Sequence, residues 1–176
     1  MKAVVYTEYA PDDNFAKILK VQDIDDPKPK SDEVVFKVKA AALNYNDIWG
    51  MRGQPVPVPL PHVSGSDAAG DVIAVGEDVK NIKVGDRVVS HSNMSCRVCK
   101  ACTDGREFDC VKRMIWGFQT GPNWGAFSEI THLPEVNVAK IPEGVSYDEA
   151  AAASMTLLTS WHIDRKSTRL NSSHRC

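Results

Sequence analysis

No stretch of this chain is apolar over the roughly 20 residues that a helix needs to cross a bilayer. None resembles the apolar core of a secretory signal peptide either. The 176 residues include 21 Lys and Arg against 23 Asp and Glu, which gives a net charge of −2. The chain therefore lacks the positive excess typical of proteins that bind nucleic acid or anionic membranes. We expect neither kind of partner.

The glycine-rich turn of dinucleotide-binding domains is also absent. That turn has the spacing G-x-G-x-x-G and leads from a strand into a helix. The nearest candidate, Gly65 to Gly70, has the wrong spacing and leads into strand-forming residues. At 176 residues the chain has room for one domain and part of a second. A complete nucleotide-binding domain is therefore excluded within it.

Four of the five cysteines lie close together, in the spacing C-x2-C-x2-C-x7-C: Cys96, Cys99, Cys102 and Cys110. Thiolates at such short intervals can surround one ion, and structural Zn²⁺ takes four ligands of this kind in a tetrahedron. Four protein ligands leave no position for substrate. The pattern predicts one structural zinc, held in a lobe over residues 95–111. Reduced thiolates favour a cytoplasmic location.

Two other uses of these cysteines fit the sequence less well. Paired disulfides fit poorly, because the cysteine count is odd and no signal sequence is evident. An iron–sulfur cluster also uses C-x2-C-x2-C, but the bacterial pattern places the fourth cysteine after three residues rather than seven.

Strand signals dominate the first 145 residues. Residues 34–40 alternate between apolar side chains and lysines, which is typical of a strand buried on one face. Further strands are expected at residues 2–6, 71–75, 84–90, 126–131 and 136–141. Many short strands between Gly, Asp and Pro indicate an antiparallel barrel or sandwich. The proline-rich residues 55–61 predict an extended surface crossing.

The pattern becomes helical near residue 146. Ser146 and Glu149 have the spacing of a capping box, and four alanines follow. From residue 164 the composition is polar and predicts a disordered end. Residues 164–174 also match the in-frame translation of a common sequencing adapter that begins GATCGGAAGAGC. We therefore expect residues 164–176 to derive from an adapter, and the natural protein to be longer.

Several motifs in order resemble the medium-chain dehydrogenase/reductase superfamily, which includes zinc alcohol dehydrogenases and quinone oxidoreductases. They are LNYNDIWGMRG, PHVSGSDAAGDVIAVGEDV, VGDRV, the cysteine lobe, GAFSEI and LLTSWH. The resemblance covers residues 1–163. It implies a mainly β fold, a GroES-like, partly open barrel with a zinc lobe, as the catalytic domain over residues 1–145. Residues 146–163 would lead as a helix into a nucleotide-binding domain that this chain lacks.

The resemblance also implies a parent protein that uses NAD(P)H, acts on a small molecule and forms a homo-oligomer. Zinc alcohol dehydrogenases of this superfamily hold a second, catalytic zinc. Its three ligands fall here on Asn44, Ser66 and Met155. This set offers neither thiolate nor imidazole, so the catalytic zinc is expected to be absent. Thr159 falls where the family contacts its cofactor.

Without that metal, hydride transfer suits an acceptor that is already conjugated, such as an enone or quinone. The Asn44 amide and the Tyr45 and Ser66 hydroxyls are the candidate donors to its oxyanion. Asn44 and its neighbours can equally be read as caps of a turn, Trp49 as pocket or core, and His62 as a solvated loop residue.

Three functions follow for the parent. The first is reduction of an enone, a quinone or a carbonyl. The second is zinc alcohol dehydrogenase activity. The third is a non-catalytic, zinc-stabilised binding module.

Overall fold

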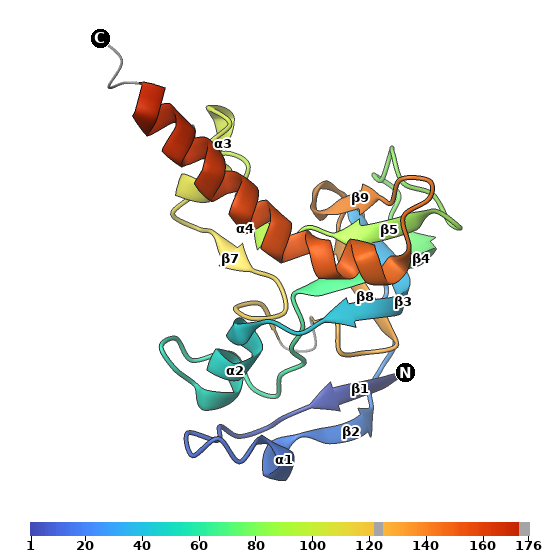
Figure 1. The fold of residues 1–176 in the computed structure, drawn as a ribbon. Helices are drawn as coiled ribbons and strands as arrows, with labels where there is room; N and C mark the ends of the chain where they lie inside the picture. Colours follow the sequence, from blue (N-terminus) through green and yellow to red (C-terminus); the bar gives the residue numbers. More distant parts are fainter. Residues whose placement is uncertain (122–124, 173–176) are drawn as a thin grey trace.

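The structure of the protein, a computed structural model, describes residues 1–121 and 125–172. Its centre is a five-stranded antiparallel sheet that curls into a half-barrel (Figure 1). The strand order is β8-β3-β4-β5-β9. The bounds are Glu33–Ala42 for β3, Asp67–Val75 for β4, Arg87–Ser90 for β5, Ile130–Pro134 for β8 and Val138–Lys140 for β9. The predicted mainly β, GroES-like fold is confirmed.

Two small sheets and several helices surround this half-barrel. The small sheets pair β1 (Lys2–Val5) with β2 (Lys20–Asp23), and β6 (Asn93–Met94) with β7 (Met114–Ile115). The α-helices are α1 (Phe15–Ile18), α2 (Tyr45–Arg52), α3 (Lys100–Thr103) and α4 (Tyr147–Ser172). Two 3-10 helices span η1 (Glu107–Asp109) and η2 (Glu135–Asn137).

Two apolar clusters give the molecule its core. The larger fills the half-barrel and includes Val34, Phe36, Trp116 and Leu133, all fully buried. The second lies between the N-terminal hairpin and α2 and is built around Tyr6. Burial of such side chains is worth about 1.5–3 kcal/mol each, so these clusters hold the sheet and α2 in place.

The predicted strands exist, but several bounds differ. The strand expected at 126–131 begins at Ile130, because the backbone N–H groups of Ala126 and Phe127 bond Gly65 and Ser64 instead. The strand expected at 84–90 begins at Arg87, because Gly85 and Asp86 form a turn. The strand expected at 136–141 spans only 138–140, after η2.

Other differences lie in β3 and in the small elements. β3 was expected to have one buried face, but both faces of its first four residues are buried, and alternation starts at Lys37. The small strands β2, β6 and β7 were not predicted. The proline-rich residues 55–61 form no strand and are exposed, except that Val58 packs into the core; bends at residues 55–56 and 60–61 interrupt the extended crossing that was expected.

Helix α4 begins where the sequence predicted. The Ser146 N–H donates to Glu149 Oε2 at 2.9 Å, and the Glu149 N–H donates to Ser146 Oγ at 3.2 Å, which is the reciprocal capping box. The helix lies across the five-stranded sheet (Figure 1) and buries Ala150 and Ala151 there. Further along, Leu157 and Trp161 are each 63% exposed.

The disordered end predicted from residue 164 differs from the structure. Helix α4 continues through Ser172, while residues 173–176 lie outside the described part. Extending an existing helix adds one hydrogen bond per residue without a new nucleation cost, so a polar segment can continue it. No helix within the described residues is long and apolar enough to cross a membrane.

Gly117 provides a direct test of the packing near α2 and β4. It has a φ of +72°, and a Cβ there would approach the Gly65 carbonyl oxygen to 1.9 Å. Gly144 has a φ of +84° but nothing within 4 Å of a Cβ. Alanine at Gly144 should cost about 1 kcal/mol of unfolding free energy from the backbone conformation alone.

Gly117→Ala should cost at least about 2 kcal/mol more than Gly144→Ala, because the Gly65 backbone must move. Urea denaturation of the two variants measures the difference. Equal losses would show that the Gly65–Gly117 approach is looser than described.

Candidate functional site

Side-chain hydrogen bonds join the N-terminus of α2 to the start of β4. Three residues from segment 44–47 each bond one residue of segment 65–67. The pairs are Asn44–Asp67 at 2.8 Å, Asn46–Ser66 at 2.7 Å and Asp47–Gly65 at 3.0 Å. Residue numbers rise along the first segment as they fall along the second, so the two segments run antiparallel. We call these three pairs the clamp.

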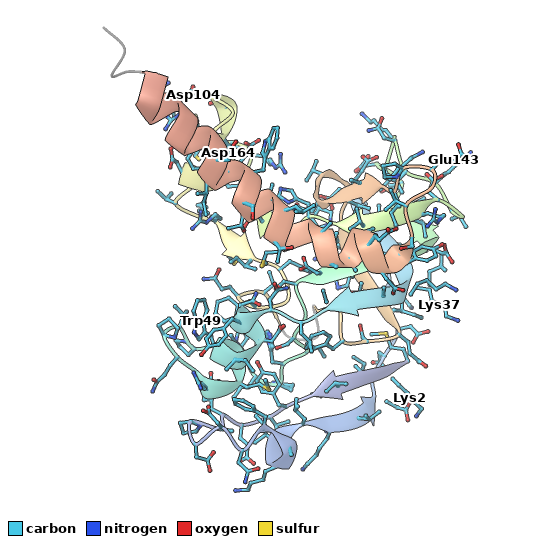
Figure 2. All side chains as sticks on the ribbon, in the orientation of Figure 1. Lys2, Lys37, Trp49, Asp104, Glu143 and Asp164 are labelled. Atoms are coloured by element: carbon cyan, nitrogen blue, oxygen red, sulfur yellow. The ribbon has the colours of Figure 1, made fainter. Side chains whose placement is uncertain are left out.

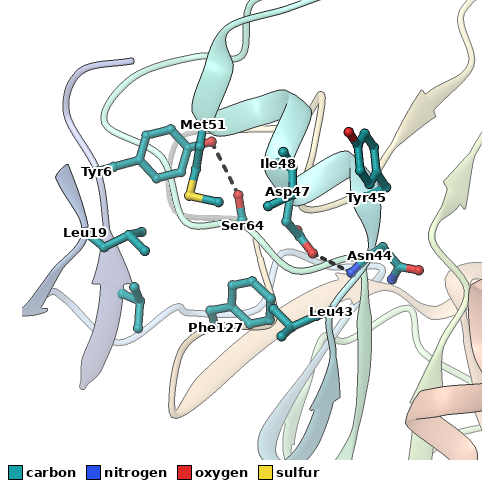
Figure 3. A pocket seen from close by; sticks show the side chains of 11 residues that line it. Tyr6, Leu19, Leu43, Asn44, Tyr45, Asp47, Ile48, Met51, Ser64 and Phe127 are labelled. Atoms are coloured by element: carbon teal, nitrogen blue, oxygen red, sulfur yellow. Dashed lines mark hydrogen bonds between the residues drawn. The ribbon is translucent and has the colours of Figure 1, made fainter. Parts of the chain in front are cut away.

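Asp47 is the anchor of the clamp on α2. One carboxylate oxygen accepts from the Asn44 N–H at 2.8 Å, which caps the helix (Figure 3), and the other accepts from the Gly65 N–H. The side chain is only 3% exposed. Burial raises the pKa of Asp47 to about 6, although the two N–H donors oppose the shift. Asp47 thus anchors this turn through both of its oxygens.

Asp67 extends the clamp to α4. Its Oδ2 accepts from the Asn44 amide, and its Oδ1 accepts from the Met155 backbone N–H at 3.0 Å. Asp67 is fully buried, and this burial raises its pKa. Sequence reasoning missed this residue. The signal was its position next to Ser66, in a motif that the resemblance had already marked.

The structure therefore brings together the three positions where the family's catalytic metal ligands fall, but around a carboxylate. Asn44 uses one amide N–H on Asp67, and Ser66 Oγ accepts from Asn46. Met155 reaches Asp67 through its backbone. A divalent metal site needs three or more free donor atoms, and this set offers none of the usual N or S ligands. The residues do not fit a catalytic zinc.

The candidate donors differ in accessibility. Tyr45 is 61% exposed and its hydroxyl accepts from Arg52 Nη1 at 3.4 Å, whereas Ser66 is fully buried. Asn44 is half-buried between them. A ligand can thus reach Asn44 and Tyr45, while Ser66 lies behind them as the partner of Asn46.

An apolar cavity of about 450 Å³ lies between α2 and the N-terminal hairpin. Figure 3 shows Leu19, Met51 and Phe127 around it. Asn44 and Tyr45 lie at its edge, with their side chains directed away from Leu19 and Met51. The candidate donors therefore do not converge into this cavity.

The structure also places Trp49, for which the sequence allowed either pocket or core, and His62, which was expected to be a solvated loop residue. Trp49 is 40% exposed at the outside of α2 (Figure 2), edge-on to Tyr45 at 5.4 Å. The expectation that His62 is solvated is wrong, since its side chain is fully buried. Its Nε2 donates to the Gly117 carbonyl at 3.2 Å, and burial lowers its pKa. Because its ring is buried and bonds a backbone carbonyl, this loop histidine is a core residue.

Thr159 lies away from the clamp. It lines a cavity of about 720 Å³ between α4 and the cysteine lobe, together with His91, Arg97 and His162. The ring of Phe108, from the lobe, packs on His162 at 4.4 Å. The structure thus does not bring Thr159 into one cavity with Asn44 and Tyr45.

The four cysteines converge as the spacing predicted. All four Sγ atoms lie within 4.8 Å of one another. The Sγ–Sγ distances are 3.5 Å for Cys99–Cys102, 3.6 Å for Cys96–Cys110 and 3.9 Å for Cys96–Cys102. A regular tetrahedron with Zn–S bonds of about 2.3 Å has edges of about 3.8 Å. The donor set therefore fits a four-coordinate zinc.

The pKa values of two of the thiols are shifted in opposite directions. Backbone N–H groups of Val98 and Cys99 lower the pKa of Cys96 to about 6, which favours the thiolate that a metal requires, whereas burial raises the pKa of Cys102 to about 11. α3 and η1 supply the turns that bring these cysteines together.

Comparison with known proteins identifies the family to which this fold belongs. The profile of the alcohol dehydrogenase GroES-like domain matches residues 30–143. The chain belongs to this family. It is thereby a member of the medium-chain dehydrogenase/reductase superfamily.

The individual relatives include both reductases and dehydrogenases. The chain is 36% identical to crotonyl-CoA carboxylase/reductase of Cereibacter sphaeroides, over 82% of this chain and 34% of that protein. It is 34% identical to acryloyl-coenzyme A reductase of Metallosphaera sedula, over 75% and 39%. A crystal structure of an NAD-dependent alcohol dehydrogenase superposes with a TM-score of 0.84 at 39% identity, over 92% and 45%. The chain thus spans less than half the length of each.

The raised pKa of Asp47 predicts a pH-dependent stability. Its ordinary value is 3.8 and its folded value about 6, so between these pH values the folded state holds a proton that the unfolded state has lost. This group therefore contributes stability below about pH 4 that is lost as the pH rises through 6. The loss amounts to about 3 kcal/mol at most.

Asp47→Asn removes this titration. The unfolding free energy of the wild type minus that of the variant should fall between pH 4 and pH 7, measured by urea denaturation at each pH. Subtracting the variant cancels the titration of other carboxyls. A difference that is constant or rises with pH would contradict the raised pKa.

Proposed function

We propose that Cys96, Cys99, Cys102 and Cys110 bind one structural zinc. The proposal is supported by sulfur distances that match the edges of a zinc tetrahedron. Four thiolate ligands leave the ion no open position, so its contribution is to hold the lobe together rather than to act on substrate. The reduced thiolates it requires favour a cytoplasmic location.

Metal analysis of the purified protein should give one zinc per chain. Cys99→Ser should weaken zinc binding roughly 100-fold or more, since one of four ligands is lost and binding is coupled to folding of the lobe. Competition with a chromophoric chelator measures the affinity. Cys176→Ser, outside the cluster, is the matched control and should bind like the wild type. Equal affinity in both variants, or two zincs per chain, would contradict the proposal.

We further propose that the parent of this chain is an NAD(P)-dependent oxidoreductase, with residues 1–145 as its catalytic domain. The reaction is reduction of a carbonyl-conjugated acceptor, such as an enone, quinone or enoyl thioester. The observation that carries this is the clamp. Asn44, Ser66 and Met155 are engaged with Asp67 and Asn46 and leave no ligand set for a catalytic metal.

Without a Lewis acid to polarise it, the acceptor must already be polarised by its own conjugated carbonyl group. Crotonyl and acryloyl groups, named in two of the relatives, are α,β-unsaturated acyl groups of this kind. The bound nicotinamide would supply a hydride in the parent. This chain would supply hydrogen bonds to the carbonyl oxygen as negative charge grows on it. Asn44 retains a second amide N–H for this role, because only one is used on Asp67, and the Tyr45 hydroxyl is exposed.

The cofactor itself belongs to the part of the parent beyond this chain. The eleven glycines include no G-x-G pair, so the phosphate-binding turn is absent from the sequence. The helical residues 146–163 would lead to that domain. A zinc-dependent alcohol dehydrogenase and a non-catalytic binding module are less well supported, the first because the ligand set is missing and the second because the relatives carry enzyme names.

The test of the reaction uses the parent recovered from its transcript. It should reduce crotonyl-CoA or 2-cyclohexenone with NADPH or NADH, followed at 340 nm, at least about 100-fold more efficiently than it oxidises simple alcohols. Its activity should survive removal of all but one zinc per chain. Zinc-dependent alcohol oxidation as the main activity would contradict the proposal.

The present chain should neither bind NAD(P)H usefully nor catalyse the reaction alone. Titration followed by nicotinamide fluorescence should show no saturation in the micromolar range, because the cradle for the phosphates is missing. The recovered parent is the positive control. Saturable micromolar binding by the 176-residue chain would show that a nucleotide site lies within it.

A further inference from the structure

Asp67 combines three features. It is fully buried, both of its oxygens accept hydrogen bonds, and the donors come from two different elements. One donor is the side chain of Asn44 at the start of α2, and the other is the backbone of Met155 on α4. A buried carboxylate is stable only when its oxygens are bonded in this way, so the geometry of both donors is constrained by Asp67.

The Asn44 amide depends on this contact for its orientation. An amide has two N–H donors and one carbonyl oxygen, and it can rotate by half a turn about its terminal bond. Because an ionised carboxylate only accepts, Asp67 selects the rotamer in which the amide nitrogen faces it at 2.8 Å. The remaining N–H and the carbonyl oxygen then hold fixed positions. The Asn44 side chain also takes part in the capping box at the start of α2.

The Met155 contact adds a second constraint. Ser154, next to it, donates to the Ser90 carbonyl at 2.5 Å, so α4 is tied to β4 and β5 at neighbouring residues. Leu157 and Ile163, further along, are 63% and 60% exposed. Asp67 therefore lies where the docked part of α4 gives way to its exposed part, and it bonds the site and the helix simultaneously.

We infer that Asp67 is the positioning residue of the candidate site: it orients the Asn44 amide toward the acceptor and sets that amide relative to α4. It acts through Asn44 and touches neither substrate nor cofactor. This inference rests on the proposed function, since it assigns Asn44 the role of donor to the acceptor oxygen. One carboxylate thereby sets the positions of both the Asn44 amide and the Met155 backbone within α4.

The test uses NMR spectroscopy of the 176-residue chain with its zinc. In the wild type, one Asn44 side-chain amide proton should be shifted downfield by the carboxylate and should exchange slowly with solvent. Asp67→Ala should remove that shift and accelerate exchange at least about tenfold, and the Met155 amide proton should move upfield. Asp67→Asn keeps the side-chain size and should disturb the same two signals. It takes the place of the alanine variant if that variant folds poorly.

The matched control is Asp71→Asn. Asp71 lies on the same strand and also contacts α4, through the hydroxyl of Tyr147, but touches neither Asn44 nor Met155. It should leave both signals unchanged. If Asp71→Asn altered the Asn44 signals as much as the Asp67 variants do, the role of Asp67 would be general docking of the helix and the inference would be overturned.

A swapped pair provides the rescue. In N44D/D67N the donor and acceptor exchange places, and the introduced amide at position 67 keeps an oxygen for the Met155 N–H. The swap should restore the shifted, slowly exchanging side-chain amide that D67N alone loses. Failure of the swap, with D67N fully folded, would overturn the inference. Because no substrate or nicotinamide is used, this outcome is separate from failure of the proposed reaction.

Discussion

The desolvation of two carboxylates is the constraint on which the site depends. Asp47 and Asp67 are both removed from water, and each must find its hydrogen bonds inside the protein. Asp47 finds them on backbone N–H groups from two segments, and Asp67 on Asn44 and Met155. The need to satisfy these groups joins α2, β4 and α4 more specifically than apolar packing could, since apolar contacts tolerate small shifts and hydrogen bonds do not.

The two regions with functional chemistry are built differently. The cysteine lobe is local in sequence: its four sulfurs come from fifteen consecutive residues, and short turns suffice to converge them. The clamp is long-range and requires the finished half-barrel, because β4 must be paired with β3 before its first residues face α2. The lobe approaches α4 through Phe108 and His162, so both regions border this helix.

Much of the fold was predictable from local patterns. The alternation around Lys37 predicted β3, and the Ser146–Glu149 pair predicted the start of α4. The predicted ends of the strands were less accurate. For β8, the reason is that the N–H groups of Ala126 and Phe127 donate to a distant loop rather than to a neighbouring strand. The burial of His62 was missed for a similar reason. Its partner, the Gly117 carbonyl, lies 55 residues away, and no local signal reveals it.

The amino-acid sequence by itself determined the family, the cysteine cluster and the absence of metal ligands at Asn44, Ser66 and Met155, because these follow from residue identity and short spacing. Only the tertiary structure decided what those three residues do instead. It buried Ser66, turned the Asn44 amide to Asp67 and brought the backbone of Met155 to the same carboxylate. The physical reason is that a hydrogen bond between residues 88 positions apart depends on how strands and helices pack, and no pattern within either segment encodes its partner.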